Sequence, residues 1–492
     1  MLLGIDQGTT GTLACLVEAD GRIVARAYAA HRQICPRPGW VEHDAEEIWR
    51  CVERTVGEVL DGAGGARPDG VALANQGETV LAWDRRTGRP LHHALVWQDT
   101  RTQPLVERLA ADPAIAARVR DETGLPLDPY FSAPKLRWLL DEVPGARALA
   151  RAGHLRAGTL DAWLIERLTG GGPALTDPST AARTLLCDTR AHRWSPFLLE
   201  LFDVPGAVLP EIRDTDAGFG ACAAPGLPGL AGVPIVASLV DQPAALAGHG
   251  CVDAGDAKAT FGTGCFVYAG TGATRPRGGG TLATVAWKRS GAPATYALDG
   301  GVLAAGSAID WLREVGVLGA GEPLDAALAG ARRDPGVVCV PALVGLGAPH
   351  WDRGARAAWL GMSSAATRAD LASALAEGVA CRVAEVVAAI ERDAGLAIAE
   401  LRADGGLTRS AALMQLQADL LGRPVAVAEE DEATVSGACA IAALRTRTLS
   451  ETELRARRGR ARARYEPRMS ADERAARLDR FARARELAAR WR

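Results

Sequence analysis

With 492 residues, the chain is too long for one ordinary hydrophobic core, which predicts two domains or one large duplicated unit with a cleft between its halves. Apolar residues make up 48% of the chain and charged residues 23%, the balance of a globular protein and not of a disordered or fibrous one. The formal net charge of -3 provides no general attraction to nucleic acid or to an anionic membrane surface, so we expect small-molecule partners.

The cysteines and the first residues indicate the cellular setting. Ten cysteines lie between Cys15 and Cys439 without a CxxC pair or a tight His/Cys cluster, which favours reduced thiols over a zinc site or a disulfide framework. Residues 1–6 lack the basic and apolar regions of a secretory signal, and no apolar run reaches membrane-spanning length. The sequence therefore predicts a cytoplasmic protein without membrane insertion.

The N-terminal segment predicts a β-hairpin with a polar tip. Apolar residues 2–5 run into the Gly- and Thr-rich stretch 6–12, and a second apolar run follows over residues 13–17. Two short runs around a Gly/Thr turn recur over residues 257–268, so we expect two related halves. Residues 234–239 have the pattern of a buried strand and lead into a helix that extends through Ala247.

The alternation of strands and helices predicts an α/β fold with mostly buried sheets and leaves the strand order open. Apolar spacing near 3.6 predicts further helices over residues 134–140, 161–168, 304–315, 368–393 and 411–421. We predict a first domain over residues 1–248, a second over 249–445 and a basic helical tail over 446–492. A nucleic-acid contact is conceivable for the Arg-rich residues 455–464, but their interspersed Glu and Ala favour a solvated helix face.

Three Gly-containing segments have the composition of phosphate-binding loops. Phosphoryl transfer from a nucleotide requires backbone amides and hydroxyls beside the phosphates and a carboxylate for magnesium. Residues 6–12 supply all of these, although such a turn on its own also simply ends a strand. The turn at 261–264 and the Gly-Gly segment at 403–410 add two further loops, which together could surround one triphosphate.

Residues 130–142, YFSAPKLRWLLDE, match the first signature of the FGGY carbohydrate kinases throughout, and residues 359–378 approximate the second. The chain resembles this family over nearly its whole length. Within the family it is most similar to the glycerol kinases, on runs such as PGWVEHD at 38–44, GTGCF at 262–266 and GLGAPHWD at 345–352. The resemblance implies a two-lobed, actin-like (ribonuclease H-like) ATPase fold with duplicated domains around a central cleft.

The resemblance also implies an activity, ATP-dependent phosphorylation of a hydroxyl of a small polyol or sugar, with glycerol the leading acceptor and Mg²⁺-ATP the donor. Asp241 would be the general base. The acceptor pocket would contain Gly77, Glu78, Trp97, Tyr130, Gln242 and Phe266. The nucleotide would lie against Thr9, Thr10, Gly11, Thr263, Gly264, Gly306, Asp310, Gly405, Gly406 and Ser410, with Asp6 as the magnesium ligand.

Several of these residues also have a purely structural interpretation. Asp241 lies between a strand and a helix and is a good N-cap residue. Trp97 and Phe266, each taken alone, are typical of core aromatic residues, and Glu78 alone is typical of a solvated loop carboxylate.

Two departures from the glycerol kinase pattern concern the acceptor and the phosphate loop. Gly77 stands where typical glycerol kinases have Arg, and Leu13 stands where they have another Arg. Other family members do without the second Arg, so the departures affect the choice of acceptor more than the reaction class. A kinase for a longer polyol or a ketopentose such as xylulose, and a non-catalytic sugar- or nucleotide-binding regulator, stay open, as does a homo-oligomeric state.

A further expectation concerns regulation. Some bacterial glycerol kinases are inhibited by fructose 1,6-bisphosphate, which binds a Gly-Gly-x-Gly-Gly-Thr-Arg loop between subunits. The corresponding residues here, 221–233, contain neither Arg nor Lys, and two prolines remove amide hydrogens that a phosphate would need. The sequence predicts no inhibition by the bisphosphate through this loop.

Overall fold

The N-terminal hairpin is the first part of a five-stranded sheet. The computed structural model describes residues 1–18 and 20–491. Strands β1, β2 and β3 pair antiparallel to one another. On the other side of β1, strand β5 pairs parallel with β1 and β13 pairs parallel with β5, which gives the order β13-β5-β1-β2-β3. The strands are β1 Leu2–Gln7, β2 Gly11–Val17, β3 Ile23–Ala30, β5 Gly70–Asn75 and β13 Ile235–Val240. The near-continuous burial of β1, β5 and β13 is the pattern of strands covered on both faces, whereas the edge strand β3 is largely exposed.

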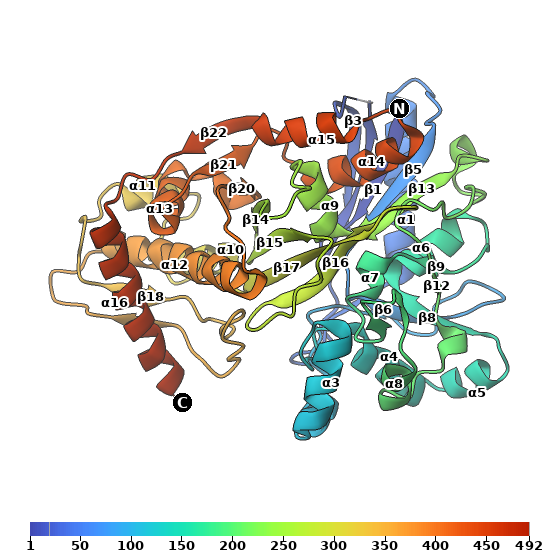
Figure 1. Cartoon of the computed structure of the whole chain (residues 1–492), viewed down its shortest axis with the longest axis horizontal. Helices are drawn as coiled ribbons and strands as arrows, with labels where there is room; N and C mark the ends of the chain where they lie inside the picture. The colour runs from blue at the N-terminus through green and yellow to red at the C-terminus, as the bar shows by residue number, and fades with distance from the viewer. Residues whose placement is uncertain (19, 492) are drawn as a thin grey trace.

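A second sheet repeats this arrangement with seven strands. In the order β16-β17-β15-β14-β20-β21-β22, strands β14, β15 and β17 form the antiparallel part, while β20 and β21 run parallel to β14. The strands are β14 Ala257–Phe261, β15 Cys265–Gly272, β16 Leu282–Lys288, β17 Ala294–Val302, β20 Leu401–Asp404, β21 Val425–Ala428 and β22 Ala461–Tyr465. The two related halves expected from the hairpins are thus present, and the α/β duplicated architecture is confirmed (Figure 1).

Smaller sheets extend the two lobes. A four-stranded sheet in the first lobe has the order β4-β7-β6-β8, and three two-stranded pairs occur elsewhere. The four strands are β4 Glu42–His43, β7 Ala94–Leu95, β6 Val80–Asp84 and β8 Leu155–Thr159. The pairs are β9 Leu175–Thr176 with β12 Glu211–Ile212, β10 Cys187–Asp188 with β11 Arg193–Trp194, and β18 Val338–Val340 with β19 Ala358–Leu360.

Helices cover the sheets, and their ends follow local capping chemistry. Asp44 caps α1 by accepting from the Glu46 amide, and Thr367 with Asp370 forms a capping box on α12, which ends at Gly395 in the left-handed region. The helices are α1 Ala45–Gly62, α2 Gln103–Ala110, α3 Pro113–Thr123, α4 Ser132–Glu142, α5 Ala146–Arg151, α6 Leu160–Leu168, α7 Pro178–Ala181, α8 Pro196–Leu201, α9 Asp241–Gly248, α10 Gly306–Glu314, α11 Leu324–Leu328, α12 Arg368–Ala394, α13 Ala411–Leu421, α14 Ala433–Thr446, α15 Glu451–Ala456 and α16 Ala471–Arg490. All of the helices predicted from apolar spacing are present, with shifts of at most two residues at their ends.

The two lobes share a core where α9 meets α14. A Cβ on Gly437 of α14 would lie 1.8 Å from the Ala244 carbonyl oxygen of α9, so only glycine permits this close contact. Val435 and Cys439 of α14 in turn pack over Gly4 of the first-lobe sheet. Figure 1 shows α14 lying over the first lobe although it follows the strands of the second lobe in sequence.

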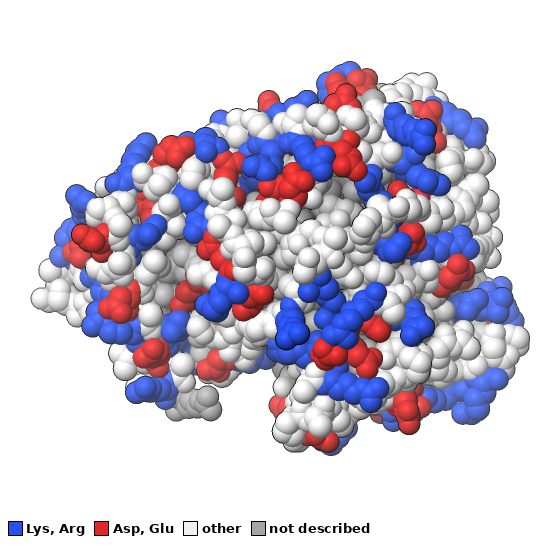
Figure 2. Space-filling model, viewed as in Figure 1, with Lys and Arg blue, Asp and Glu red and all other residues white. Residues whose placement is uncertain are grey.

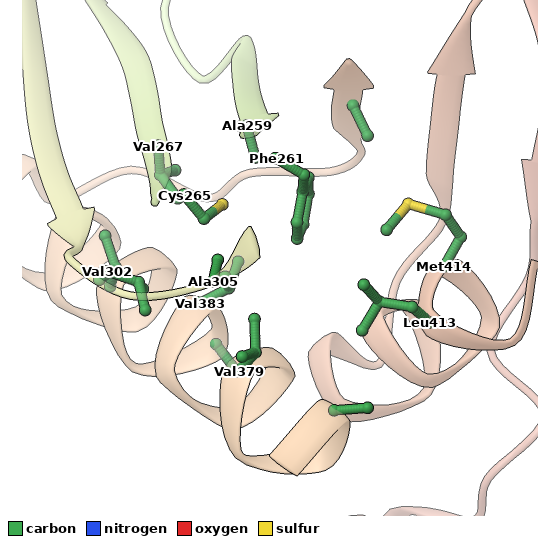
Figure 3. Close-up of a cluster of buried hydrophobic side chains, with 14 of the residues drawn as sticks. Ala259, Phe261, Cys265, Val267, Val302, Ala305, Val379, Val383, Leu413 and Met414 are labelled. Carbon is green, nitrogen blue, oxygen red and sulfur yellow. The ribbon is translucent and has the colours of Figure 1, made fainter. Parts of the chain in front are cut away.

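The core of the second lobe lies directly beneath two of the predicted nucleotide loops. Figure 3 shows Phe261 at the end of β14 pointing between side chains of α12 and α13, among them Val379, Leu413 and Met414. Phe261 is fully buried and directly precedes the turn at 262–264. This packing fixes the position of the turn.

The C-terminal segment, for which the sequence predicts a basic helical tail, contains two helices and also a strand. Between α15 and α16, Ala461–Tyr465 forms the edge strand β22, paired antiparallel with β21. Its Ala-Arg alternation places Ala463 and Tyr465 against the core cluster and the arginines outside, which is a strand period and not a helical one.

The surface charges are mixed. Figure 2 shows Lys and Arg interspersed with Asp and Glu over the visible face.

Among the described residues, no helix combines the length and apolar character needed to cross a membrane.

Candidate active site

A cavity of about 120 Å³ lies between the lobes and contains all of the predicted acceptor residues. Its walls come from the ends of strands in both sheets and from the loops that follow them. The lining residues are Thr9, Gln76, Gly77, Glu78, Trp97, Tyr130, Arg183, Val240, Asp241, Gln242, Phe266, Tyr268 and Asp299. The cavity is small beside the roughly 300–1,000 Å³ of typical ligand pockets, which suits a small polar molecule.

Asp241 lies where β13 ends and α9 begins. Val240 is the N-cap residue and Asp241 is the first residue of the helix, so the predicted N-cap role is wrong. Its Oδ1 accepts a hydrogen bond of 2.6 Å from the Gln242 backbone amide. Burial, and then the negative charge of Glu78, raise the pKa of Asp241 to about 6. The carboxylate is therefore ionised at neutral pH and basic enough to accept a proton.

The neighbouring Gln242 is held by a buried lysine. Lys258 on β14 donates from Nζ to the Gln242 side-chain oxygen and, over 2.8 Å, to Thr260 Oγ1. Burial lowers the pKa of Lys258, opposed by the carboxylates of Asp404 and Asp241. Lys258 thus fixes Gln242 from the second lobe and brings a positive charge near Asp241.

Three aromatic side chains form one wall of the cavity. The Trp97 ring meets Tyr130 at 5.5 Å and Phe266 at 6.3 Å between centroids, both edge to face. Trp97 Nε1 donates to Thr9 Oγ1 over 2.9 Å. All three rings are only half-buried, because one face of each borders the cavity. The core-aromatic interpretation therefore does not describe them.

Arg183, Tyr268 and Asp299 also line the cavity, although sequence reasoning gave them no role. Arg183 follows α7, and its Nε donates to Glu78 Oε1 over 2.6 Å while its Nη1 lies 3.0 Å from Asp299 Oδ2. Glu78 is 5% exposed and bound in this ion pair, so it is not a solvated loop carboxylate. No local sequence pattern links residues this far apart, although the buried charges of Arg183 and Asp299 mark them once the fold is known.

The predicted phosphate loop at residues 6–12 places its two adjacent threonines in different cavities. Thr9 lines the acceptor cavity, whereas Thr10, Gly11 and Asp6 line a neighbouring open cavity of about 500 Å³. Asp6 Oδ1 is buried without a hydrogen-bond partner. Burial, followed by the charges of Asp241 and Glu432, raises the pKa of Asp6 to about 8.

Two glycine-dependent contacts join the second-lobe loops. A Cβ on Gly306 would lie 2.5 Å from the Gly262 carbonyl oxygen, so the start of α10 packs directly on the turn that contains Thr263 and Gly264. Gly405 has a φ of +90° and faces the Phe261 carbonyl oxygen, where a Cβ would lie at 2.6 Å. By contrast, a Cβ on Gly406 would meet no atom within 4 Å. These contacts bring the loops at 262–264, 306 and 405–406 together.

Asp310 and Ser410 are engaged elsewhere in the structure. Asp310 is exposed and pairs with Arg313 of the same helix at 2.8 Å. The Ser410 hydroxyl caps α13, accepting from the Leu413 amide over 3.1 Å, and donates to Asp325 of α11. A nucleotide contact by either residue would require these partners to be exchanged.

Comparisons with known proteins agree over the full length of the chain. The model of the N-terminal domain of the FGGY family of carbohydrate kinases matches residues 1–248, and that of the C-terminal domain matches residues 257–446. The chain is 45% identical to a glycerol kinase of Alkalilimnicola ehrlichii, covering 100% of this chain and 98% of the relative.

Solved structures show the same likeness. A Plasmodium falciparum glycerol kinase with ADP superposes with a TM-score of 0.92 at 31% identity, over 99% of this chain and 98% of the other. A xylulose kinase from Rhodospirillum rubrum superposes with a TM-score of 0.84 at 26% identity, over 99% and 97% of the two chains.

Proposed function

The chain belongs to the FGGY family of carbohydrate kinases, and from this premise we propose that it transfers the γ-phosphoryl group of ATP to a hydroxyl of glycerol. The observation that carries the proposal is the position of Asp241, a half-buried base that shares a small cavity, lined by both lobes, with Glu78 and Gln242. The relatives named glycerol kinase, at 41–45% identity, support glycerol as the acceptor.

The proposed reaction needs little covalent chemistry from the protein. Asp241 takes the proton of the acceptor hydroxyl as the hydroxyl oxygen bonds to the γ-phosphorus of ATP. At the same time the bond between the γ-phosphorus and the bridging oxygen breaks, and ADP leaves with that oxygen. Glu78 and Gln242 present an acidic and an amide side chain to the other hydroxyls, and Trp97 and Phe266 pack against the carbon chain. Closure of the two lobes over this cavity would exclude water, which would otherwise compete as the acceptor.

The nucleotide would lie between the loop at 9–11 and the loops at 262–264, 306 and 405–406. A divalent cation such as Mg²⁺, when bound with ATP, would neutralise charge on the phosphates. Asp6 fits such an ion because one of its buried oxygens has no hydrogen-bond partner. Within residues 1–18 and 20–491, no group of three or more Asp, Glu, His or Cys side chains is arranged to hold a metal ion.

The acceptor assignment is tested by measuring ADP release with glycerol, erythritol, xylulose and no acceptor, at saturating Mg²⁺-ATP. We expect glycerol to give the highest kcat/KM. Highest turnover with xylulose would replace glycerol by a ketopentose, and ATP binding without turnover on any acceptor would favour the regulator.

The division of the chain stays part of this proposal. Residues 1–248 would supply the acceptor base and the first phosphate loop, and residues 249–445 would supply most of the nucleotide site. The segment 446–492 would complete the second lobe through β22 and α16. We propose a cytoplasmic enzyme, and its oligomeric state can be measured by light scattering.

Gly406 provides a test of the nucleotide site that leaves the fold intact. Gly406→Val is expected to raise the KM for ATP by at least about tenfold, equivalent to ~1.4 kcal/mol, because its side chain would enter space that no protein atom occupies. Its melting temperature should stay unchanged. Gly405→Ala is the matched control, and its positive φ and contact with Phe261 predict a lower melting temperature. An unchanged KM for ATP in Gly406→Val would place the nucleotide elsewhere.

The loop at 221–233 is expected to be insensitive to fructose 1,6-bisphosphate. Arg67 lies beside it, but its Nη2 is bound to the Ala231 carbonyl over 2.5 Å, and the Glu53 carboxylate lies against Gly226, where it would repel phosphate. Millimolar bisphosphate should leave glycerol phosphorylation unchanged. Saturable inhibition that disappeared when residues 225–231 were altered would contradict this prediction.

A further inference from the structure

Arg183 is the central charge of the acceptor cavity. Its side chain is 2% exposed and lies between two carboxylates, Glu78 at 2.6 Å and Asp299 at 3.0 Å. It also lies beside the rings of Tyr130 and Phe131, at 5.8 and 5.6 Å from their centroids. The planar guanidinium can hold two carboxylates at once, which a lysine ammonium does less well. Arg183 therefore sets the orientation of both acidic side chains.

The environment of Gly77 explains why Arg183 can occupy this place. A Cβ on Gly77 would lie 2.5 Å from Val240 Cγ2 and 3.5 Å from Arg183 Cγ. A longer side chain at position 77 would therefore displace Val240 or the stem of Arg183. The absence of a side chain at Gly77 therefore adds no space on the side of Val240 and Arg183. The cavity still has a guanidinium, supplied by a residue 105 positions beyond Glu78.

Arg183 and Asp299 border more than the acceptor cavity. Both residues, with Tyr130 and Phe266, also line a second, tighter chamber of about 30 Å³. The remaining wall of this chamber is formed by Leu282, Gly301, Leu303, Leu346 and Trp351 together with the charged Arg353. At about 30 Å³ this chamber has room for little more than one water molecule, so an acceptor chain longer than glycerol would not extend into it. Asp299, which borders both spaces, has its Oδ1 buried without a hydrogen-bond partner.

We propose that Asp299, held beside Glu78 by Arg183, completes the acceptor site by contacting the hydroxyl farthest from Asp241, and that this contact restricts the enzyme to three-carbon polyols. The inference rests on the proposed function. Asp299 contacts the distal hydroxyl, and Arg183 acts as a positioning residue through the two carboxylates. Gln242 and Asp241 are left for the hydroxyls nearer the phosphoryl group.

The test pairs enzyme variants with an acceptor that lacks the distal hydroxyl. Glycerol and propane-1,2-diol differ by this group when phosphorylated at the opposite end. We expect Arg183→Lys and Asp299→Asn each to lower kcat/KM for glycerol about 10- to 100-fold, with a larger change in KM than in kcat. For propane-1,2-diol, each variant should lower kcat/KM less than about threefold. The KM for ATP should be unchanged, and erythritol should be at least about tenfold poorer than glycerol with the wild type.

The variants are chosen to fold. Arg183→Lys keeps the buried positive charge, whereas a neutral residue at position 183 would leave two carboxylates unpaired. Asp299→Asn neutralises only one of the two carboxylates and leaves Glu78 paired with Arg183. Asp370→Asn is the matched control because Asp370 is a buried partner of Arg332 outside the cavity, and it should change stability without changing acceptor preference. Melting temperatures are recorded for all three variants.

The outcomes separate this inference from the function on which it rests. Equal losses with glycerol and propane-1,2-diol in both variants would show that Arg183 and Asp299 have only a structural role and would overturn the proposed contact. Equal turnover of erythritol and glycerol would overturn the limit on chain length. A wild-type enzyme that phosphorylates no polyol would instead overturn the proposed function.

Discussion

Asp241→Asn is expected to lower kcat for glycerol about a thousandfold or more while leaving the fold and ATP binding intact. The magnitude lies in the upper part of the range for general-base catalysis. Asparagine has nearly the same shape, and its Oδ1 can still accept the hydrogen bond that Asp241 receives from the Gln242 amide. It cannot take a proton from the acceptor. The measurement is single-turnover phosphorylation at saturating ATP and glycerol, which isolates chemistry from product release.

The accompanying measurements exclude a folding defect. ATP affinity, determined by equilibrium titration, should be close to that of the wild type. The melting temperature of Asp241→Asn should be equal to or higher than that of the wild type, because the variant removes a carboxylate whose charged form is disfavoured by burial. Near-normal turnover in this variant would remove Asp241 from the role of base.

Asp6→Asn is expected to separate activity from stability. Turnover should fall roughly a hundredfold or more, because the charge stabilisation supplied by a metal ion is worth several kcal/mol and its carboxylate ligand is lost. The metal-free variant should nevertheless melt at a higher temperature than the wild type at pH 8. Calorimetry without magnesium and a turnover assay over a range of magnesium concentrations check the two parts.

The sign of the stability change follows from the pKa of Asp6, which burial raises from 3.8 to about 8. Because the folded chain binds this proton more tightly than the unfolded chain, stability falls as the pH rises between these two values. Asparagine carries no such charge, so the advantage of the variant should be largest near pH 8 and should shrink towards pH 4. A variant that melts lower at pH 8, or that keeps full turnover, would contradict the assignment.

Local patterns predicted the parts of the fold that local chemistry determines. Both hairpins and the long helices follow from the periodicity of apolar residues and from Gly/Thr turns, and the structure confirms them. The strand β22 was missed because Arg and Ala favour helices, whereas pairing with β21 and contact of Tyr465 with the core favour the extended form. Tertiary contacts decided this segment.

The candidate site divides in the same way. The residues around Asp241 could be predicted because they lie in recognisable runs, and the structure brings them into one cavity. Arg183 and Asp299 could not, since only folding places them beside Glu78. Gly77 stands where typical glycerol kinases have Arg, but the side chains of Val240 and Arg183 fill the space that a side chain there would enter. A missing side chain in the sequence is therefore not a vacancy in the structure.

The central claim is tested most directly by following the phosphorus of ATP with ³¹P NMR during incubation with glycerol and magnesium. We predict that ADP and a single phosphomonoester, glycerol 3-phosphate, accumulate in equal amounts, and that neither forms with Asp241→Asn on the same timescale. Release of inorganic phosphate in place of the phosphomonoester, or unchanged ATP with active wild-type protein, would contradict the assignment of this chain as a glycerol-phosphorylating enzyme.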